Sequence, residues 1–505
     1  MGFLDNIILG FQVCLSPTNF LFCLVGVTLG TLVGVLPGIG PMGCIAILFP
    51  ATFKMEATTG IIMMAGIWYG AMYGGSTSSI LVNIPGEAAS VVTCLDGYQM
   101  ARQGRAGPAL GISAMGSFIA GTLSVIGLMV VAVPLATVAL RFGPPEYFAV
   151  MCAGVVIVTY LARGSTLKAL MMAAVGIILA NTGLDLITGL PRFTFGFEEL
   201  TDGIKLASVV MGLFGISEVF INLETTIKTD IYKTKYSNLW PSLKDWANSI
   251  GAILRGTAIG FGLGSLPGVG SITSSFVSYA VEKKVSKHPE RFGKGAIEGV
   301  AGPESANNAA TGGNLISLIA LGIPSNALLA LLYSSLIVHG IQPGPLFIKG
   351  HPDIFWGLIA SMYLGNVLLV VLNLPLIAIW VKVLKIPYHI LFPLILLFCL
   401  IGVYSLDGST FDLYIMLIFG VLGYLMRKFG YEAAPLVLTF VLTPQLEAHL
   451  RRSLTLSDGS FAIFFTRPIA AGVLSFAFLL LLSNFLPYLK KGLKKQEAFA
   501  DEEDG

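Results

Sequence analysis

The amino-acid sequence predicts an all-α polytopic membrane protein of about 12 segments, including re-entrant hairpins, that is built from two inverted-topology repeats. Three observations support this fold class. Of the 505 residues, 55% are hydrophobic and only 11% are charged, whereas about 25% of the residues in an average soluble domain are charged. Long apolar stretches recur between Leu21 and Pro487. One Pro-Gly motif also occurs twice, at corresponding places in the two halves of the chain.

The apolar stretches predict membrane-spanning helices. Short polar loops separate them, and a helix needs about 20 apolar residues to cross the hydrocarbon core. The first residues, MGFLDNIILGF, include no basic segment and no A-x-A cleavage site, so we expect no cleaved signal peptide. The six cysteines stand singly in mostly apolar surroundings, which favours buried thiols over metal or disulfide chemistry.

The segment GVLPGIGP, Gly34 to Pro41, follows an apolar run and contains two prolines and three glycines. Such a break frees backbone N–H and C=O groups that lipid cannot satisfy. Irregular backbone at membrane depth therefore occurs only where protein buries it or water reaches it. The motif predicts the tip of a re-entrant hairpin or a break between half-helices, and a tight turn at the end of a span is the structural alternative.

Four landmarks recur in the same order in the second half of the chain. GSLPGVGS repeats the first motif, with Pro267 placed 230 residues after Pro37. Within GGSTSSILVNIPGE, one glycine and the Ile-Pro pair recur in GGNLISLIALGIPS at offsets of 238 and 239, and RGSTLK recurs as DGSTFD at 244. This order predicts two repeats. The predicted divisions are a first membrane repeat at 1–225, a linker at 226–250, a second membrane repeat at 251–489 and a charged tail at 490–505.

The basic residues predict that the two copies are oppositely oriented. In the first copy, the loop at 53–58 has one basic residue and the loop at 102–105 has two, whereas the corresponding loops of the second copy have five and one. Basic loops of membrane proteins face the cytoplasm. This reversal therefore predicts an inverted-topology repeat. The linker and the C-terminal tail are then cytoplasmic and the start of the chain lies outside, with Arg451 and Arg452 as an exception on the outside.

Two clusters of hydroxyl and amide side chains lie within the predicted helices. Both are flanked by glycines, and each is followed by a proline, Pro85 or Pro324. Such side chains can simply mediate helix packing, but two clusters at corresponding places predict a substrate site. The polar candidates are Ser76, Thr77, Ser78, Ser79, Asn83, Asn307, Asn308, Thr311 and Asn314.

Catalytic signatures are missing from the sequence. It has no H-E-x-x-H, no Gly-x-Ser-x-Gly and no Walker lysine loop, and its five histidines stand apart from one another. We therefore expect no enzyme activity and no catalytic residues. A passive anion channel and an intramembrane enzyme acting on a lipid carboxylate remain as alternatives.

Five motifs resemble the signatures of the large membrane subunit of the tripartite tricarboxylate transporters, the TctA family. They are GTLVGVLPGIGP, YGGSTSSILVNIPGEAASVVTCLDGYQMARQGRAGPAL, GSLPGVGS, FGKGAIEGVAGPESANNAATGGNLI and GIQPGP. The resemblance covers nearly the whole chain. It implies a multi-pass permease of the bacterial inner membrane that works with a small four-span membrane subunit and a periplasmic solute-binding protein.

The resemblance also implies uptake of a citrate-like di- or tricarboxylate by symport with a cation, usually sodium, and no other cofactor. Family motifs carry over onto Gly38, Gly40, Gly268, Gly270, Asn307 and Asn308. The stretch NNAATGGNLI is more hydroxylated than the Ala/Cys-containing version that is associated with citrate transporters. The resemblance therefore leaves the identity of the carboxylate open.

The charge of a carboxylate substrate constrains the site. The two Pro-Gly turns contain no Arg or Lys, so N–H groups, helix N-termini and hydroxyls would have to hold the anion. One terminus contributes about 0.3–1 kcal/mol, whereas desolvating a carboxylate costs several kcal/mol. Bound cations would supply the missing charge. The turn candidates for substrate binding are Gly38, Ile39, Gly40, Pro41, Gly268, Val269, Gly270 and Ser271, and the Na+ candidates are Gly38, Gly40, Gly268, Gly270, Asn308 and Thr311.

Proton-coupled uptake through a membrane carboxylate is the competing mechanism. Glu87 and Glu304 are its candidates, since they lie beside the two polar clusters. From their sequence surroundings we expect both to be loop or helix-cap residues.

Overall fold

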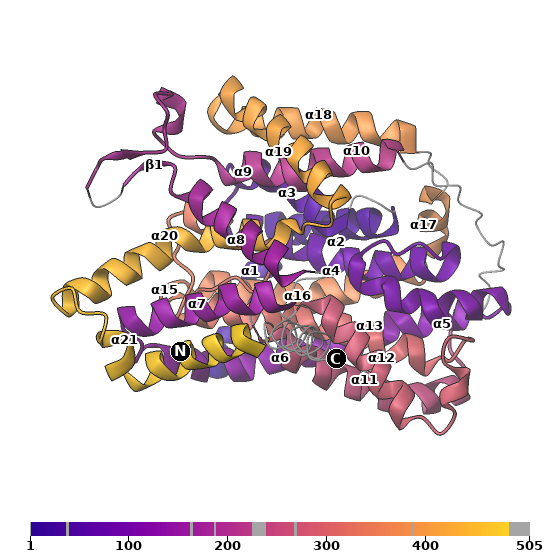
Figure 1. The fold of residues 1–505 in the computed structure, drawn as a ribbon. Helices are drawn as coiled ribbons and strands as arrows, with labels where there is room; N and C mark the ends of the chain where they lie inside the picture. Colours follow the sequence, from indigo (N-terminus) through magenta and orange to yellow (C-terminus); the bar gives the residue numbers. More distant parts are fainter. Residues whose placement is uncertain are drawn as a thin grey trace, which may run out of the picture. The chain divides into compact units, whose positions relative to one another are not determined.

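The computed structural model describes residues 2–36, 40–161, 165–185, 188–224, 239–266, 270–384 and 388–483. Helices account for most of these residues (Figure 1). The two strands of this part of the chain, β1 (Gly183–Leu184) and β2 (Pro191–Arg192), form one short antiparallel pair. The all-α class predicted from the sequence is confirmed.

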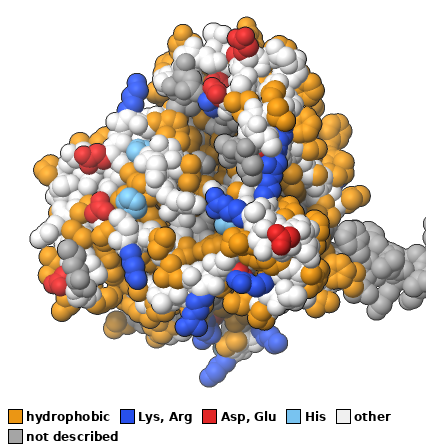
Figure 2. Space-filling view, turned by 90° about the vertical axis from the view of Figure 1, so that its left-hand side faces the viewer, with side chains coloured by type: hydrophobic (Ala, Val, Ile, Leu, Met, Phe, Trp, Pro, Cys, Tyr) orange, Lys and Arg blue, Asp and Glu red, His pale blue; other side chains and the backbone are white. Residues whose placement is uncertain are grey.

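Within the described ranges, five helices are long and apolar enough to cross a membrane. They are Pro17–Val35, Ala106–Ala139, Leu206–Glu224, Pro352–Asn373 and Thr410–Lys428. Shorter apolar helices accompany them, and many large apolar side chains lie on the surface, as the broad apolar areas in Figure 2 show. These features are typical of a multi-pass membrane protein, because a lipid-facing surface needs no polar cover.

The chain forms two compact units. Unit 1 comprises Met1–Leu140 and Ile204–Phe429, and unit 2 comprises Arg141–Gly203 and Gly430–Gly505. Each unit combines chain from both sides of the predicted linker at 226–250. The two units are groups of segments that pack together in space. They do not correspond to the two repeats, which the sequence predicts as successive stretches of the chain.

Unit 1 contains most of the helices. Its first part has α1 (Phe3–Cys14), α2 (Pro17–Val35), α3 (Gly40–Thr52), α4 (Ala57–Val82), η1 (Ala88–Ser90), α5 (Val91–Arg102) and α6 (Ala106–Ala139). Its second part begins with α9 (Leu206–Val210), the π-helix η3 (Met211–Ile216), α10 (Ser217–Glu224), α11 (Leu243–Gly264), α12 (Ser271–Val285), η4 (Pro289–Arg291), α13 (Glu298–Ile316) and the π-helix η5 (Ser317–Leu321). It ends with α14 (Ala327–Val338), α15 (Phe347–Gly350), α16 (Pro352–Asn373), α17 (Ile377–Val383), α18 (Tyr388–Asp407) and α19 (Thr410–Lys428).

Unit 2 is smaller. It has α7 (Pro144–Leu161), α8 (Thr166–Ala180), the two strands, η2 (Glu198–Leu200), α20 (Ala433–Leu456), α21 (Ile463–Thr466) and the apolar helix Pro468–Ser483. Helix α20 packs against α7 and α8. A Cβ atom on Gly176 of α8 would lie 2.3 Å from the carbonyl oxygen of Leu436 in α20, so these two helices are in close backbone contact.

Helices α2 and α4 of unit 1 pack closely through glycines. A Cβ atom at three positions of α2, spaced four residues apart, would lie 2.2–2.5 Å from carbonyl oxygens of α4. The pairs are Gly26 with Met63, Gly30 with Ile67 and Gly34 with Ala71. Stripes of small residues let membrane helices approach in this way. As a result α4 is buried on every side from Thr58 to Val82.

Helices α11 and α13 pack in the same manner. A Cβ atom at three positions of α11 would lie 2.2–2.6 Å from carbonyl oxygens of α13. The pairs are Gly256 with Gly302, Gly260 with Ala306 and Gly264 with Ala310. Helix α13 is buried from Gly299 to Ile316. The core of unit 1 therefore contains two enclosed helices, α4 and α13, and these two carry the polar clusters.

Candidate functional site

A buried carboxylate lies within α13. Glu304 is 1% exposed, and its Oε2 accepts a hydrogen bond of 2.5 Å from Ser76 Oγ of α4. Its Oε1 accepts a hydrogen bond from Thr93 Oγ1 of α5. In the described part of the chain no Arg, Lys or His pairs with Glu304. This carboxylate is held by hydroxyl groups alone.

The position of Glu304 corrects the expectation that it is a loop or cap residue. Pro303 suggests a break in the sequence, but α13 begins at Glu298 and continues through Pro303 to Ile316. Pro303 is the sixth residue of α13, and it removes the N–H that would bond to the carbonyl oxygen of Gly299 without ending the helix. Glu304 therefore lies within a regular, enclosed helix.

Glu87 confirms the expectation of a cap residue. It stands at the N-cap of η1, and its side chain accepts a backbone hydrogen bond in that short helix. Its Oε1 also accepts a hydrogen bond of 2.6 Å from Asn307 Nδ2 of α13. A Cβ atom at Gly75 would lie 2.8 Å from Cγ of Glu87, so a glycine in α4 lets the loop come this close.

Asn307 and Asn308 share a face of α13 with Glu304, because residues three and four positions apart are neighbours on a helix. Asn308 Nδ2 donates to Ser117 Oγ of α6 at 2.7 Å and to the carbonyl oxygen of Glu304 at 3.1 Å. The Oδ1 atom of Asn307 is buried and accepts no hydrogen bond. Thr311 Oγ1 donates to the carbonyl oxygen of Asn308 at 2.7 Å. Three of the predicted residues thus follow one another along the face that carries Glu304.

The other polar candidates have varied surroundings. In α4, Ser78 and Ser79 donate to the carbonyl oxygen of Gly75 in their own helix, and Thr77 is buried. The hydroxyl of Ser76 in this cluster donates to the carboxylate of Glu304 in α13. Asn83 ends α4 in a left-handed conformation and is exposed.

Asn314 lies near the end of α13. Its Oδ1 accepts a hydrogen bond of 3.1 Å from Ser325 Oγ, beyond the proline break at Pro324. Its Nδ2 atom is buried without a hydrogen-bond partner. Asn314 therefore fixes the chain that follows the second cluster and leaves one donor unused.

The two Pro-Gly turns are partly described. The candidates Gly38, Ile39, Gly268 and Val269 lie outside the described residues. On either side of them, α2 ends at Val35 and α3 begins at Gly40, while α11 ends at Gly264 and α12 begins at Ser271. Gly40 has φ of +64°, which a residue with a side chain rarely adopts. Gly40, Pro41 and Gly270 are partly exposed, and Ser271 is 9% exposed.

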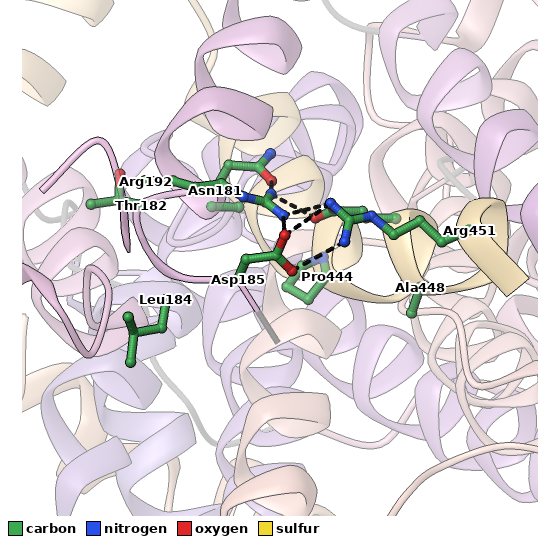
Figure 3. A pocket seen from close by; sticks show the side chains of 10 residues that line it. Asn181, Thr182, Leu184, Asp185, Arg192, Pro444, Ala448 and Arg451 are labelled. Atoms are coloured by element: carbon green, nitrogen blue, oxygen red, sulfur yellow. Dashed lines mark hydrogen bonds and ion pairs between the residues drawn. The ribbon is translucent and has the colours of Figure 1, made fainter. Parts of the chain in front are cut away.

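A charged cluster in unit 2 surrounds a cavity of about 210 Å³ (Figure 3). Arg451 donates to both carboxylate oxygens of Asp185 at 3.1 Å and lies 2.6 Å from Oε1 of Glu447. Arg192 pairs with the same two carboxylates and donates to Asn181 Oδ1 at 3.0 Å. Hydrogen bonds that Arg192 donates to Glu447 and Asp185 raise the pKa of Arg192. Two guanidinium groups here face two carboxylates, so the cluster is balanced in charge.

Comparison with known proteins identifies the family. The family model described as "Tripartite tricarboxylate transporter TctA family" matches residues 20–438. The chain belongs to this family. No solved structure matches it.

Two curated relatives of this TctA family member come from Agrobacterium vitis. The "Uncharacterized 52.8 kDa protein in TAR-I ttuC' 3'region" is 50% identical over 503 residues, which cover 100% of both chains. The "Uncharacterized protein in TAR-II ttuC' 3'region" is 50% identical over 241 residues, which cover 48% of this chain and 99% of the relative. The family is that of a transporter's membrane component and not of an enzyme.

Asp96 of this TctA family member is a buried polar residue that the sequence did not reveal. Its Oδ1 accepts backbone hydrogen bonds of 2.8–2.9 Å from Gly293, Gly295 and Ala296, and its Oδ2 accepts one of 2.9 Å from Tyr279 Oη. These groups lie more than 180 residues further along the chain. Within its own motif, Asp96 shows only as a charge in the mainly apolar stretch VVTCLDG.

Proposed function

We propose that this TctA family member is the permease subunit of a binding-protein-dependent secondary transporter that imports a di- or tricarboxylate by sodium symport. It would act in the bacterial inner membrane with a small four-span membrane subunit and a periplasmic solute-binding protein. The observation that carries the proposal is the polar face of α13 in an otherwise apolar protein of the TctA family. That face contacts α4 through Ser76 and α6 through Ser117, so the two sequence halves meet at polar side chains.

Constant offsets between matching contacts support two structural repeats. The glycines of α11 follow those of α2 by 230 residues, and their partners in α13 follow those in α4 by 239. The left-handed residues Asn83, which ends α4, and Gly322, which ends η5 directly after α13, are also 239 residues apart. The same offset aligns Gly313 with Gly74, one position before the Gly75 that the sequence comparison matches to it at 238, because a Cβ on Gly74 or Gly313 would lie 2.3–2.4 Å from a carbonyl oxygen of the preceding helix.

Two contacts between loops support the inverted orientation of the repeats. Gln103 Nε2 donates to the carbonyl oxygen of Lys294 at 2.7 Å, which joins the two loops that the basic residues place in the cytoplasm. His339 Nε2 lies 2.9 Å from the carbonyl oxygen of Met55, which joins the two loops expected outside. Single cysteines introduced at 103 and 349 provide the test. An impermeant thiol reagent applied to whole cells should label the second site and spare the first, and equal labelling would reject the inversion.

Short helices after the Pro-Gly turns support re-entrant hairpins. Helix α3 has 13 residues and α12 has 15, whereas a full span needs about 20. We assign the substrate carboxylates to N–H groups near Gly40 and Gly270, with Ser271, Asn308 and Thr311 assisting, and sodium to carbonyl groups of the same turns. Helix N-termini and freed carbonyls are the groups that bind anions and cations in transporters with broken helices.

Accumulation against a gradient tests the proposed function. The complete complex, reconstituted in vesicles with its binding protein, should concentrate a radiolabelled carboxylate from a panel above its outside concentration when sodium is supplied outside. Equilibration without accumulation would favour a passive channel. Undiminished accumulation under a proton gradient without sodium would favour proton coupling. Turnover of a lipid carboxylate without transport would favour an enzyme.

A further inference from the structure

We propose that Glu304 binds the coupling cation, either a sodium ion or a proton, and that Ser76 and Thr93 complete its site. The inference rests on the proposed function, since it names the residue that links ion binding to carboxylate uptake. This site lies within α13 and is additional to the sodium ligands proposed above at the Pro-Gly turns. The inference is based on the position and the hydrogen bonds of the Glu304 carboxylate.

The environment of Glu304 leaves its negative charge unbalanced. The side chain is 1% exposed and accepts hydrogen bonds from two neutral hydroxyls of α4 and α5. The titratable groups that interact with it include Glu87, Tyr73 and Cys94, and none of these three is a cation. A buried carboxylate without a cationic partner is strongly unfavourable, and a buried group in that situation is neutralised. A bound proton or a bound monovalent cation would each provide that neutralisation. When either cation is bound, the charge of Glu304 is balanced, and α4, α5 and α13 can pack stably around it.

The oxygen atoms around Glu304 suit such a cation. A hydroxyl carries one proton and two lone pairs, so Ser76 and Thr93 can donate to the carboxylate or offer an oxygen to an ion. Hard cations prefer oxygen ligands. Asn307, three residues after Glu304, contributes a buried Oδ1 that accepts no hydrogen bond. Asn307 lies one turn after Glu304 on the same face of α13 and donates to Glu87, so this face carries an unpaired amide oxygen and two carboxylates. A bound cation would balance this excess of negative groups.

The carboxylate of this site is present in one of the two repeats and has no counterpart in the other. At the offset of 239 residues that relates α13 to α4, the position of Glu304 corresponds to Ala65, which is buried. The hydroxyls on Glu304 come from the first repeat and the carboxylate from the second. The asymmetry predicts one such cation site per chain. Movement of the helices that changes the distance from α13 to α4 and α5 would open or close it.

The first test measures cation binding without transport. The thermal unfolding midpoint of the purified full-length protein is followed while NaCl replaces choline chloride at constant ionic strength, and separately across a pH series without sodium. A ligand that binds only the folded state raises this midpoint as its concentration rises. We expect the wild-type midpoint to rise with sodium, which identifies a sodium site, or to rise on acidification alone, which identifies a proton site. Glu304→Gln should lose that response.

Ser76→Ala gives a second variant in case Glu304→Gln folds poorly. It should retain the response but require about tenfold more cation, a factor that corresponds to ~1.4 kcal/mol. Ser361→Ala is the matched control. Its hydroxyl is equally buried in α16, but it donates to the carbonyl oxygen of Leu358 in its own helix. This control should respond as the wild type does. Unchanged sodium and pH responses in both Glu304→Gln and Ser76→Ala would overturn the proposal.

Transport separates failure of this inference from failure of the proposed function. In vesicles that hold the complete complex, Glu304→Gln should abolish gradient-driven accumulation. Accumulation with unaltered ion dependence in this variant would overturn the role of Glu304 and leave carboxylate symport standing. A midpoint response that depends on Glu304, found in a protein that carries no carboxylate, would overturn the proposed substrate and leave the cation site standing.

Discussion

Glu304 in unit 1 and the Asp185–Glu447 cluster in unit 2 stabilise buried negative charge in different ways. In the cluster, Arg192 and Arg451 face the two carboxylates directly. Around Glu304, two hydroxyls are the donors, and the described residues provide no guanidinium or ammonium group. The first arrangement is complete by itself. The second depends on a mobile positive charge, which is the property that a coupling site requires.

Asp96 is intermediate between these two. It is fully buried, as Glu304 is, but three backbone N–H groups and one phenol donate to it. Several converging N–H groups form an anion-binding concavity and compensate the charge of a carboxylate. The comparison teaches that burial alone does not identify a functional carboxylate. The donors around it decide whether it needs a ligand.

Asp96→Ala should give the largest loss of stability. The substitution leaves the N–H groups of Gly293, Gly295 and Ala296 without their acceptor, and each buried unpaired donor costs about 1–3 kcal/mol. The loop before α13 should then detach from α5, with a fall in the thermal midpoint that sodium does not restore. Differential scanning fluorimetry measures this. A midpoint within a degree or so of the wild type would show that solvent replaces these bonds and that Asp96 is not a structural anchor.

Gly260→Ala should have the next largest effect. Its new Cβ would lie 2.2 Å from the carbonyl oxygen of Ala306, so α13 must shift and carry Glu304 with it. Overpacking of this kind costs about 1–3 kcal/mol. Gly262→Ala is the matched control on the same helix, since a Cβ there meets nothing within 4 Å. We expect the first variant to lose stability and cation response together and the second to keep both. Equal behaviour of the pair would contradict the close packing of α11 on α13.

Asn308→Ala should have a moderate effect. It removes the donor to Ser117 and leaves that buried hydroxyl without this partner, at a cost of about 1–3 kcal/mol. Because Asn308 is also a predicted substrate ligand, carboxylate binding should weaken beyond the loss of stability. Ser117→Ala removes the same hydrogen bond and keeps the amide. If titration calorimetry finds the same carboxylate affinity in both variants, Asn308 acts only in packing.

The sequence predicted the class of fold and much of the polar face. Gly34 and Gly264 stand in the two recurring motifs, and the polar cluster predicts Asn308 and Thr311 as site residues, with Asn308 also indicated by the family resemblance. Glu304 was expected in a loop or cap from its sequence surroundings, whereas α13 continues from Glu298 to Ile316 and packs closely against α11. The pairing of Asp185 with Arg451 joins positions 266 residues apart, and one chain carries no local sign of it.

Arg451→Ala should have the smallest effect, and it completes the comparison. Arg451 was the exception to the distribution of basic residues, and its pairing with Asp185 and Glu447 explains how a positive charge is balanced there. Its side chain is 33% exposed, so solvent and salt screen the lost interactions. Partly exposed ion pairs contribute about 0–1 kcal/mol. Arg192 still faces both carboxylates in the variant, and its raised pKa keeps it charged near neutral pH. A group with a raised pKa stabilises the fold below its unfolded pKa and loses that contribution only above it, so this cluster adds no arginine-linked pH dependence near neutrality.

For Arg451→Ala we therefore expect a small, salt-sensitive fall in the thermal midpoint and an unchanged response to sodium and acid. If Arg451→Ala abolished that response as Glu304→Gln should, the coupling charge would belong to the paired cluster, and the distinction between the two regions would fail.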